Sequence, residues 1–313
     1  MTMKAQQLYA QGILQSRAAA ARRLLSPCTL CPRQCRVDRL AGEKGFCATA
    51  SQACIASYGP HFGEETPLVG KNGSGTIFVA GCNLGCCFCQ NEDISRDTDG
   101  AQAVDARDFS AIMLELQAMG CANINVVTPS HVVPQLLEAL VVAIDGGLDI
   151  PLVYNCGGYE SLAALTLLAG CVDIYMPDMK FWSAVAAKRY ANAPDYPERM
   201  REAVVEMRQQ VGELVLDAQG RARSGLLVRH LLMPEMLAET KAILRFIAEQ
   251  VSPATYVNIM AQYRPCGDSA EYAELQRSIS AEEYQEALRF AQQIGLTRLD
   301  EPDMERLFRL LFK

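Results

Sequence analysis

Short apolar runs rich in β-branched residues alternate with amphipathic stretches along most of the chain. Six runs have the length and composition of buried strands, and we expect strands near 76–80, 123–128, 151–154, 172–176, 226–232 and 255–260. Helical patterns fall between them, at 106–119, 132–144, 161–169, 196–211 and 235–250. Strands that alternate with helices form a parallel sheet with right-handed crossovers. The sequence therefore predicts an α/β fold, built as a partial barrel of six units.

The length of 313 residues suits one such barrel with an extension at each end, because α/β barrels commonly occupy about 200–250 residues. We expect four parts: an N-terminal helix over 1–27, a cysteine-rich segment over 28–72, the barrel over 73–265 and a C-terminal helical segment over 266–313. Hydrophobic residues make up 50% of the chain, which is enough for a sizeable core.

Charge and hydropathy narrow the possible partners. The net charge of −7 offers no overall basic field for a nucleic-acid backbone. No run reaches the ~18 apolar residues that span a bilayer, and the first residues lack the pattern of a signal peptide. We therefore expect a cytoplasmic protein that binds neither nucleic acid nor membranes. In that compartment, 13 cysteines indicate metal binding or chemistry rather than disulfides, and with three histidines any metal site is mainly thiolate.

The first expected strand leads directly into a cysteine motif. Cys82, Cys86 and Cys89 have the spacing C-x3-C-x2-C, at the end of a strand where α/β barrels carry their reactive groups. Three thiolates on one tight loop can hold three irons of a [4Fe–4S] cluster and leave the fourth iron open to a substrate, whereas an electron-transfer cluster normally has four cysteines. Using Cys87 instead would give C-x4-C-x-C, which fits a single loop less well. A zinc knuckle is the alternative.

A second group of cysteines precedes the barrel. Cys28, Cys31, Cys35 and Cys47 form C-x2-C-x3-C-x11-C. Four thiolates can close a tetrahedral zinc site that staples a segment without a core of its own, and they can equally hold a second iron–sulfur cluster. The C-x2-C start and the remote fourth cysteine favour zinc, but the spacing leaves both metals open.

Taken together, the motifs resemble the radical S-adenosylmethionine (radical SAM) superfamily, and within it the PflX-type relatives of pyruvate formate-lyase-activating enzyme. The resemblance spans roughly 28–264 and rests on GSGTIFVAGCNLGCCFCQN, NINVVTPSHVVPQ, VYNCGGYE, YMPDMKF, RHLLMP and VNIMAQYRP. It implies a partial (β/α)6 radical SAM barrel with a cysteine-rich N-terminal extension.

The same resemblance implies an oxidoreductase activity. The open iron would bind the amino and carboxylate groups of S-adenosylmethionine, and reductive cleavage would give a 5′-deoxyadenosyl radical that abstracts hydrogen from a substrate. A flavodoxin or ferredoxin would supply the low-potential electron. The substrate would be a glycine of a glycyl-radical enzyme, and the alternative is another peptide or a small molecule. A non-catalytic electron-transfer protein is the third possibility, which the three-cysteine motif opposes.

The resemblance also assigns cofactor-binding residues. Phe88 would pack near the adenine, and the backbone of Thr128, Pro129 and Ser130 would meet the methionine amino group, at a position where the family commonly has Gly-Gly-Glu. Asn155, which follows the third strand, is a further candidate.

Three more candidates come from the later strands. Asp178 and Lys180 match the family's Asp-x-Lys pattern near the methionine end of the ligand or a bound cation, and His230 matches a ligand-contacting histidine. From the residues alone, Asp178 and Lys180 would rather be a solvated ion pair, and His230 a hydrogen-bonded core histidine. No catalytic residue beyond the cluster is assigned.

Overall fold

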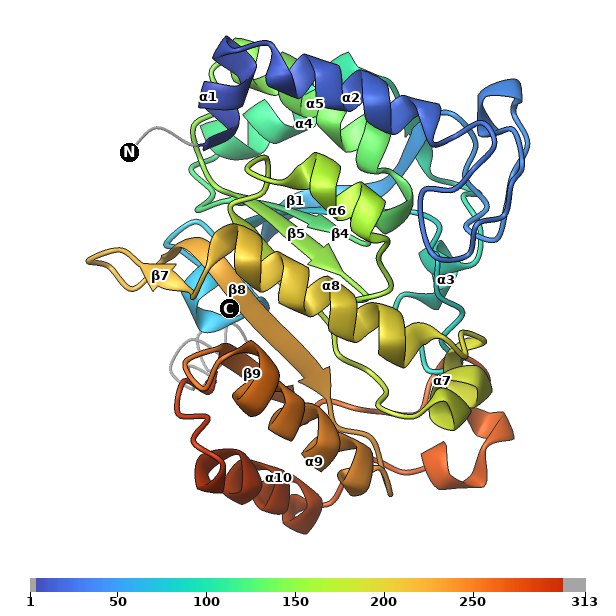
Figure 1. Ribbon diagram of the computed structural model, residues 1–313, viewed down its shortest axis with the longest axis vertical. Helices are drawn as coiled ribbons and strands as arrows, with labels where there is room; N and C mark the ends of the chain where they lie inside the picture. The colour runs from blue at the N-terminus through green and yellow to red at the C-terminus, as the bar shows by residue number, and fades with distance from the viewer. Residues whose placement is uncertain (1–3, 301–313) are drawn as a thin grey trace.

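Six parallel strands form the centre of the computed structural model, which describes residues 4–300 (Figure 1). The strand order is β2-β4-β5-β6-β8, and β9 pairs with the far side of β8. All six predicted strands are confirmed to within a few residues: β2 (Ser74–Val79), β4 (Ile124–Val127), β5 (Leu152–Cys156), β6 (Ile174–Pro177), β8 (Ala222–Leu231) and β9 (Tyr256–Met260). Within residues 4–300 no pairing joins β9 to β2, so the barrel is partial, as predicted.

Three further strands extend the sheet and were not predicted. β1 (Ala53–His61) pairs antiparallel with β2, and β3 (Gln102–Val104) pairs with β1. β7 (Val215–Leu216) forms a short hairpin with β8. Alanine, glycine and proline dilute the strand signal of β1, since Gly59 and Pro60 are both unfavourable inside a strand. The sheet therefore begins within the segment that the sequence marked only as cysteine-rich.

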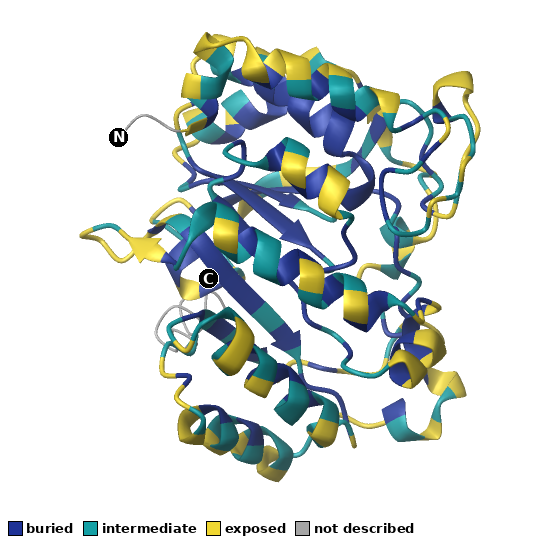
Figure 2. Ribbon diagram, in the orientation of Figure 1, coloured by how far each residue is buried: buried dark blue, intermediate teal, exposed yellow. Residues whose placement is uncertain are grey.

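The predicted helices cover the outer face of the sheet. They are α4 (Ala106–Ala118), α5 (Val133–Asp145), α6 (Leu162–Leu168), α8 (Tyr196–Val211) and α9 (Leu237–Phe246), which continues as a π-helical turn over Ile247–Val251. Figure 2 shows the strands largely buried, while the helices present a solvent-exposed edge.

The N-terminal segment contains two helices instead of the single predicted one, α1 (Lys4–Ala10) and α2 (Ile13–Arg23). Gly12 separates them because it adopts a left-handed conformation, with φ of 72°, which ends the first helix.

Short elements complete the fold. α3 (Glu92–Ser95) and α7 (Ala184–Ala191) lie in the barrel segment, and α10 (Ala281–Gln293) lies in the predicted C-terminal helical segment, of which 301–313 fall outside the described residues. Single 3-10 turns occur at Arg39–Ala41, Thr66–Leu68, Pro129–His131, Gly267–Glu271 and Ala273–Leu275. None of the described helices is long and apolar enough to cross a membrane.

The inner face of the sheet changes character along the strands. Strand register places Val153 beside Ile174, and, one step further along the same face, Asn155 beside Met176. Apolar residues of β5, β6 and β8, with Leu68 and Leu214 beside them, form a small buried core of their own: Leu68, Val153, Ile174, Met176, Leu214, Ala222 and Leu227. Polar side chains replace apolar ones toward the carboxyl ends, including Asn155 on β5 and Arg229 on β8. This inner core closes one end of the barrel, so the space for a ligand lies at the other.

Candidate functional site

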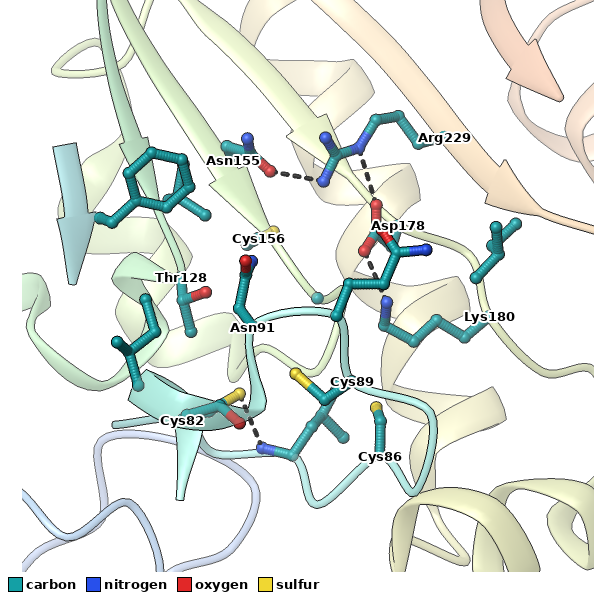
Figure 3. Close-up of a pocket in the computed structure, with 18 of the residues that line it drawn as sticks. Cys82, Cys86, Cys89, Asn91, Thr128, Asn155, Cys156, Asp178, Lys180 and Arg229 are labelled. Atoms are coloured by element: carbon teal, nitrogen blue, oxygen red, sulfur yellow. Dashed lines mark hydrogen bonds and ion pairs between the residues drawn. The ribbon is translucent and has the colours of Figure 1, made fainter. Parts of the chain in front are cut away.

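A cavity of about 370 Å³ lies at the carboxyl ends of the parallel strands. Figure 3 shows the cysteine loop on one side of it and the polar ends of the strands on the other. Cys82, Cys86 and Cys89 line the cavity together with Phe88, Thr128, Asn155, Asp178 and Lys180, which the sequence also singled out. Eight of the predicted barrel-site residues therefore meet at one cavity.

The cysteine loop follows β2 and presents its three sulfur atoms to the same space (Figure 3). The amide of Leu84 donates a hydrogen bond to the Cys82 sulfur at 3.3 Å, which holds the start of the loop. Cys87 does not line the cavity: its side chain is buried and its amide donates to the Tyr190 carbonyl at 2.8 Å. The geometry thus separates Cys87 from the other three cysteines, as the spacing suggested.

Burial makes these thiols poor acids in the absence of a cation. It raises the pKa of Cys82 to about 12 and that of Cys86 to about 11, although the Lys180 ammonium opposes the shift at both sulfurs. Metal ligation requires thiolates, so the positive charge of a metal cofactor would be needed to hold them deprotonated.

The donor set fits an iron–sulfur cluster. Cys82, Cys86 and Cys89 line one cavity from a single loop, and three thiolates can hold three irons of a cluster.

Above the sulfurs lies a buried network of charges (Figure 3). Asp178 accepts a hydrogen bond from the Lys180 ammonium at 2.6 Å and another from Arg229 Nε at 2.8 Å. Arg229 Nη2 donates to the Asn155 side-chain oxygen at 2.6 Å. The Asp178 side chain is only 12% exposed, so this pair is not the solvated surface pair considered from the sequence.

The network stays charged although it is buried. Burial alone would raise the pKa of Asp178, but the nearby Arg229 and Lys180 charges lower it below its usual value. Burial would likewise lower the pKa of Lys180, yet Asp178 and Cys86 raise it. The site therefore presents a fixed ammonium and a fixed guanidinium on either side of one carboxylate.

Arg229 and two glutamates are site residues that the sequence reasoning missed. Glu65 accepts a hydrogen bond from Asn258 at 3.0 Å and lies 4.0 Å from Arg229. Glu64 lines the cavity, with the His61 ring 2.9 Å from its carboxylate. Both glutamates follow β1, the strand that was not predicted. The sequence did carry a signal for Arg229, because it is a charged residue between apolar Leu227 and Leu231 on one face of β8.

His230 does not reach the cavity because it points to the opposite face of β8. Its Nδ1 lies 2.6 Å from the Met179 carbonyl, to which it donates, and its Nε2 lies 2.8 Å from the Thr240 hydroxyl. Burial lowers the pKa of His230 to about 4, so the ring is neutral. This placement is that of a hydrogen-bonded core histidine.

Of the three predicted residues after β4, only Thr128 lines the cavity. Thr128 lines the cavity and has φ of 62°, a left-handed conformation that a β-branched residue rarely adopts and that concentrates at functional sites. Its amide donates to the Asn155 carbonyl at 2.8 Å. Pro129 and Ser130 are buried outside the cavity lining, and the Ser130 hydroxyl donates to Glu160.

Phe88 is buried at the cavity wall. Its ring packs edge-to-face against Phe181 and Tyr263, with ring centroids 6.0 and 6.2 Å away. Phe88, held by these two rings, gives one side of the cavity an apolar surface, suited to a flat ring such as adenine.

The four N-terminal cysteines meet at a second, smaller cavity. Cys28, Cys31, Cys35 and Cys47 all line it, and Asn83 of the barrel loop forms part of its wall. The sequence alone placed these cysteines in one segment but not beside Cys82.

No family model matches the chain. Uncharacterized protein MJ0674 from Methanocaldococcus jannaschii is 29% identical over 291 residues, which cover 91% of this chain and 80% of that protein.

Two solved structures share part of the fold. Streptococcus suis SuiB bound to precursor peptide SuiA superposes with a TM-score of 0.48 and 11% identity, over 74% of this chain and 49% of that chain. The radical S-adenosylmethionine methyltransferase TsrM from Kitasatospora setae, with cobalamin and a [4Fe–4S] cluster bound, gives a TM-score of 0.43 and 14% identity, over 60% of this chain and 34% of that chain. This chain thus spans about half or less of the length of these two chains.

Proposed function

We propose that this protein is a radical SAM enzyme. The observation that carries the proposal is the set of Cys82, Cys86 and Cys89, whose three sulfurs share one buried cavity at the carboxyl ends of the parallel strands while Cys87 stands apart. Three thiolates on a cluster leave one iron without a protein ligand, which is what a substrate-binding cluster needs and an electron-transfer protein does not.

When bound, a reduced [4Fe–4S] cluster supplies the electron for cleavage of S-adenosylmethionine to a 5′-deoxyadenosyl radical, as the sequence resemblance implies. The chain's own residues would hold and orient this chemistry. Lys180 offers an ammonium for a carboxylate, and Asp178 and the Asn155 amide offer acceptors for an ammonium, all fixed by mutual hydrogen bonds. Phe88 offers the apolar wall for the adenine.

We also propose a class of substrate. By the sequence resemblance it is a glycine of a glycyl-radical enzyme, with hydrogen abstraction in the cavity and a flavodoxin or ferredoxin as electron donor in the cytoplasm. A peptide or small molecule acted on by the same radical is the alternative. The partial barrel supports entry of an extended segment, because β9 does not close onto β2 within residues 4–300.

The test is anaerobic reconstitution with iron and sulfide, followed by measurement of 5′-deoxyadenosine after reduction. We expect Cys86→Ala to lose the barrel cluster and to form no 5′-deoxyadenosine. Cys87→Ala is the matched control, since it removes an adjacent buried thiol outside the cavity, and it should retain both. Loss of the cluster in Cys87→Ala but not in Cys86→Ala would overturn the ligand assignment. Absence of 5′-deoxyadenosine from the reconstituted wild-type protein would overturn the proposed function.

A further inference from the structure

The second cavity is lined by sulfur on several sides. Cys28, Cys31 and Cys47 are 6–8% exposed, and Cys35 completes the set. Apart from the cysteines, Leu30 and Phe46 contribute apolar walls. Four thiols in one cavity are a complete ligand set for a metal cofactor, with no position left for an external ligand.

A backbone amide reaches one of the four sulfurs. The amide of Phe46 donates to the Cys35 sulfur at 3.4 Å, just as the amide of Leu84 donates to the Cys82 sulfur in the barrel loop.

An unpartnered cationic donor also lines this cavity. Arg39 is 1% exposed; its Nε donates to the Ala50 carbonyl at 3.0 Å and its Nη1 to the His131 carbonyl at 2.9 Å. Its Nη2 is buried and has no hydrogen-bond partner in the described structure. A buried guanidinium N–H without a partner is costly. A cofactor that carries negative charge and sulfur acceptors would satisfy it.

The second site has the same kind of ligand as the barrel site, because both cavities are lined by cysteine sulfurs.

The two cavities lie on opposite sides of the same loop. The Cys47 carbonyl packs so closely against Gly81 that a Cβ there would lie 2.3 Å from it, and Gly81 itself has φ of 82°. Gly81 lines the barrel cavity, whereas Asn83, two residues later, lines the second one. Since successive Cα atoms are about 3.8 Å apart, the backbone around Cys82 is the wall between the two sites.

Arg33, inside the four-cysteine motif, forms hydrogen bonds to the barrel. Its Nε donates to the Asn83 carbonyl at 2.9 Å, and its Nη2 donates to the Ala191 carbonyl at 3.2 Å. Its guanidinium also stacks on Phe46, 3.8 Å from the ring centroid. The relative position of the two cysteine sets is thus held by direct contacts.

From these observations we propose that Cys28, Cys31, Cys35 and Cys47 bind a second [4Fe–4S] cluster, which passes electrons through the Cys82 loop to the barrel cluster. One electron from a low-potential protein donor reduces the second cluster from the 2+ to the 1+ state. The second cluster returns to 2+ as the barrel cluster is reduced from 2+ to 1+, and no covalent bond changes. The relay rests on the proposed function, whereas the presence of the second cluster does not.

Metal content tests the second cluster independently of any activity. In the triple variant Cys82→Ala/Cys86→Ala/Cys89→Ala, we expect about four irons and about four sulfides per chain to remain. One zinc per chain, or no metal, would overturn the proposal. Because the triple variant could misfold, the wild-type protein is measured as well: about eight irons per chain support two clusters, and about four irons with one zinc overturn the second.

The relay is tested by reduction kinetics, without turnover. Cys35→Ser removes a partly exposed ligand of the second site, and Cys121→Ser, a buried thiol before β4 at the opposite end of the sheet, is the matched control. We expect a flavodoxin-class donor to reduce the barrel cluster in the control and not in Cys35→Ser, while dithionite reduces it in both. Equal donor-driven reduction in the two variants would overturn the relay. In the wild-type protein reduced at both clusters, an electron paramagnetic resonance signal split by spin–spin interaction is expected, and two independent signals would contradict the adjacency.

Discussion

The Arg229–Asp178 pair allows a quantitative test of the site network. Both side chains are largely buried, 17% and 12% exposed, and they are joined by a 2.8 Å hydrogen bond. Removing one partner of a buried pair leaves a charge without compensation, which costs about 3–5 kcal/mol. We therefore expect Arg229→Met to lower the free energy of unfolding by about 3 kcal/mol or more, because it leaves the buried Asp178 carboxylate with only one cation, Lys180.

A double-mutant cycle isolates the interaction. Arg229→Met, Asp178→Asn and the double variant are compared with wild type by urea unfolding of the reconstituted protein under anaerobic conditions. We expect a coupling free energy of about 1.5–3 kcal/mol between the two positions, since they share one hydrogen-bond network.

The exposed pair Arg199–Glu202 supplies the control. Its atoms are also close, at 3.0 Å, but the side chains are 41% and 40% exposed, so its coupling should stay below about 1 kcal/mol. If the Arg229–Asp178 coupling is no larger than that of the control pair, the reasoning that burial makes this network rigid and charged is wrong.

Two further predictions follow from buried groups near the site. The pKa of His230 is about 4 in the folded protein and about 6.5 in the unfolded chain, so its contribution to stability is present above pH 6.5 and is lost as the pH falls toward 4, by about 1.4 kcal/mol per pH unit. His230→Asn should therefore reduce the dependence of the unfolding free energy on pH, measured by urea titrations between pH 6 and 5. An unchanged pH dependence would contradict the assignment. Gly158 has φ of 79° and a Cβ there would lie 2.3 Å from the Asp178 carbonyl, whereas Gly147, with φ of 93°, has open space; thermal melts should therefore show Gly158→Ala more destabilised than Gly147→Ala by about 1–3 kcal/mol, and equal losses would show that the close approach is unimportant.

The main strands and helices could be predicted because their signals are local. The six parallel strands are runs of β-branched and apolar residues, and the helices between them carry the 3.6-residue pattern. β1 was missed because its pairing with β2, and not its composition, makes it a strand. With β1 missed, Glu64 could not be placed at the barrel cavity, nor Glu65 beside Arg229. The break at Gly12 was likewise missed, since the helix pattern continues on both sides of it.

Among the site residues, those with a signal in the local sequence could also be predicted. Cys82, Cys86 and Cys89 were found because metal ligands on one loop have a characteristic spacing, whereas Asp178 and Lys180 were assigned only through the family resemblance. Arg229 was overlooked in favour of its neighbour His230, although adjacent strand residues point to opposite faces. Register with β9 and the bridge to Asp178 decide that Arg229 faces the cavity and His230 the helices.

The sequence by itself determined the alternation of strands and helices and the two sets of cysteines, because periodicity and ligand spacing are properties of neighbouring residues. Only the tertiary structure decided which charges are buried together, since Glu65, Asp178 and Arg229 come from separate elements that meet across the sheet. It also decided that the four-cysteine segment packs against the back of the Cys82 loop, through Arg33 and the close approach of Cys47 to Gly81. Contacts of that kind depend on how the chain returns on itself, and no local pattern of residues records them.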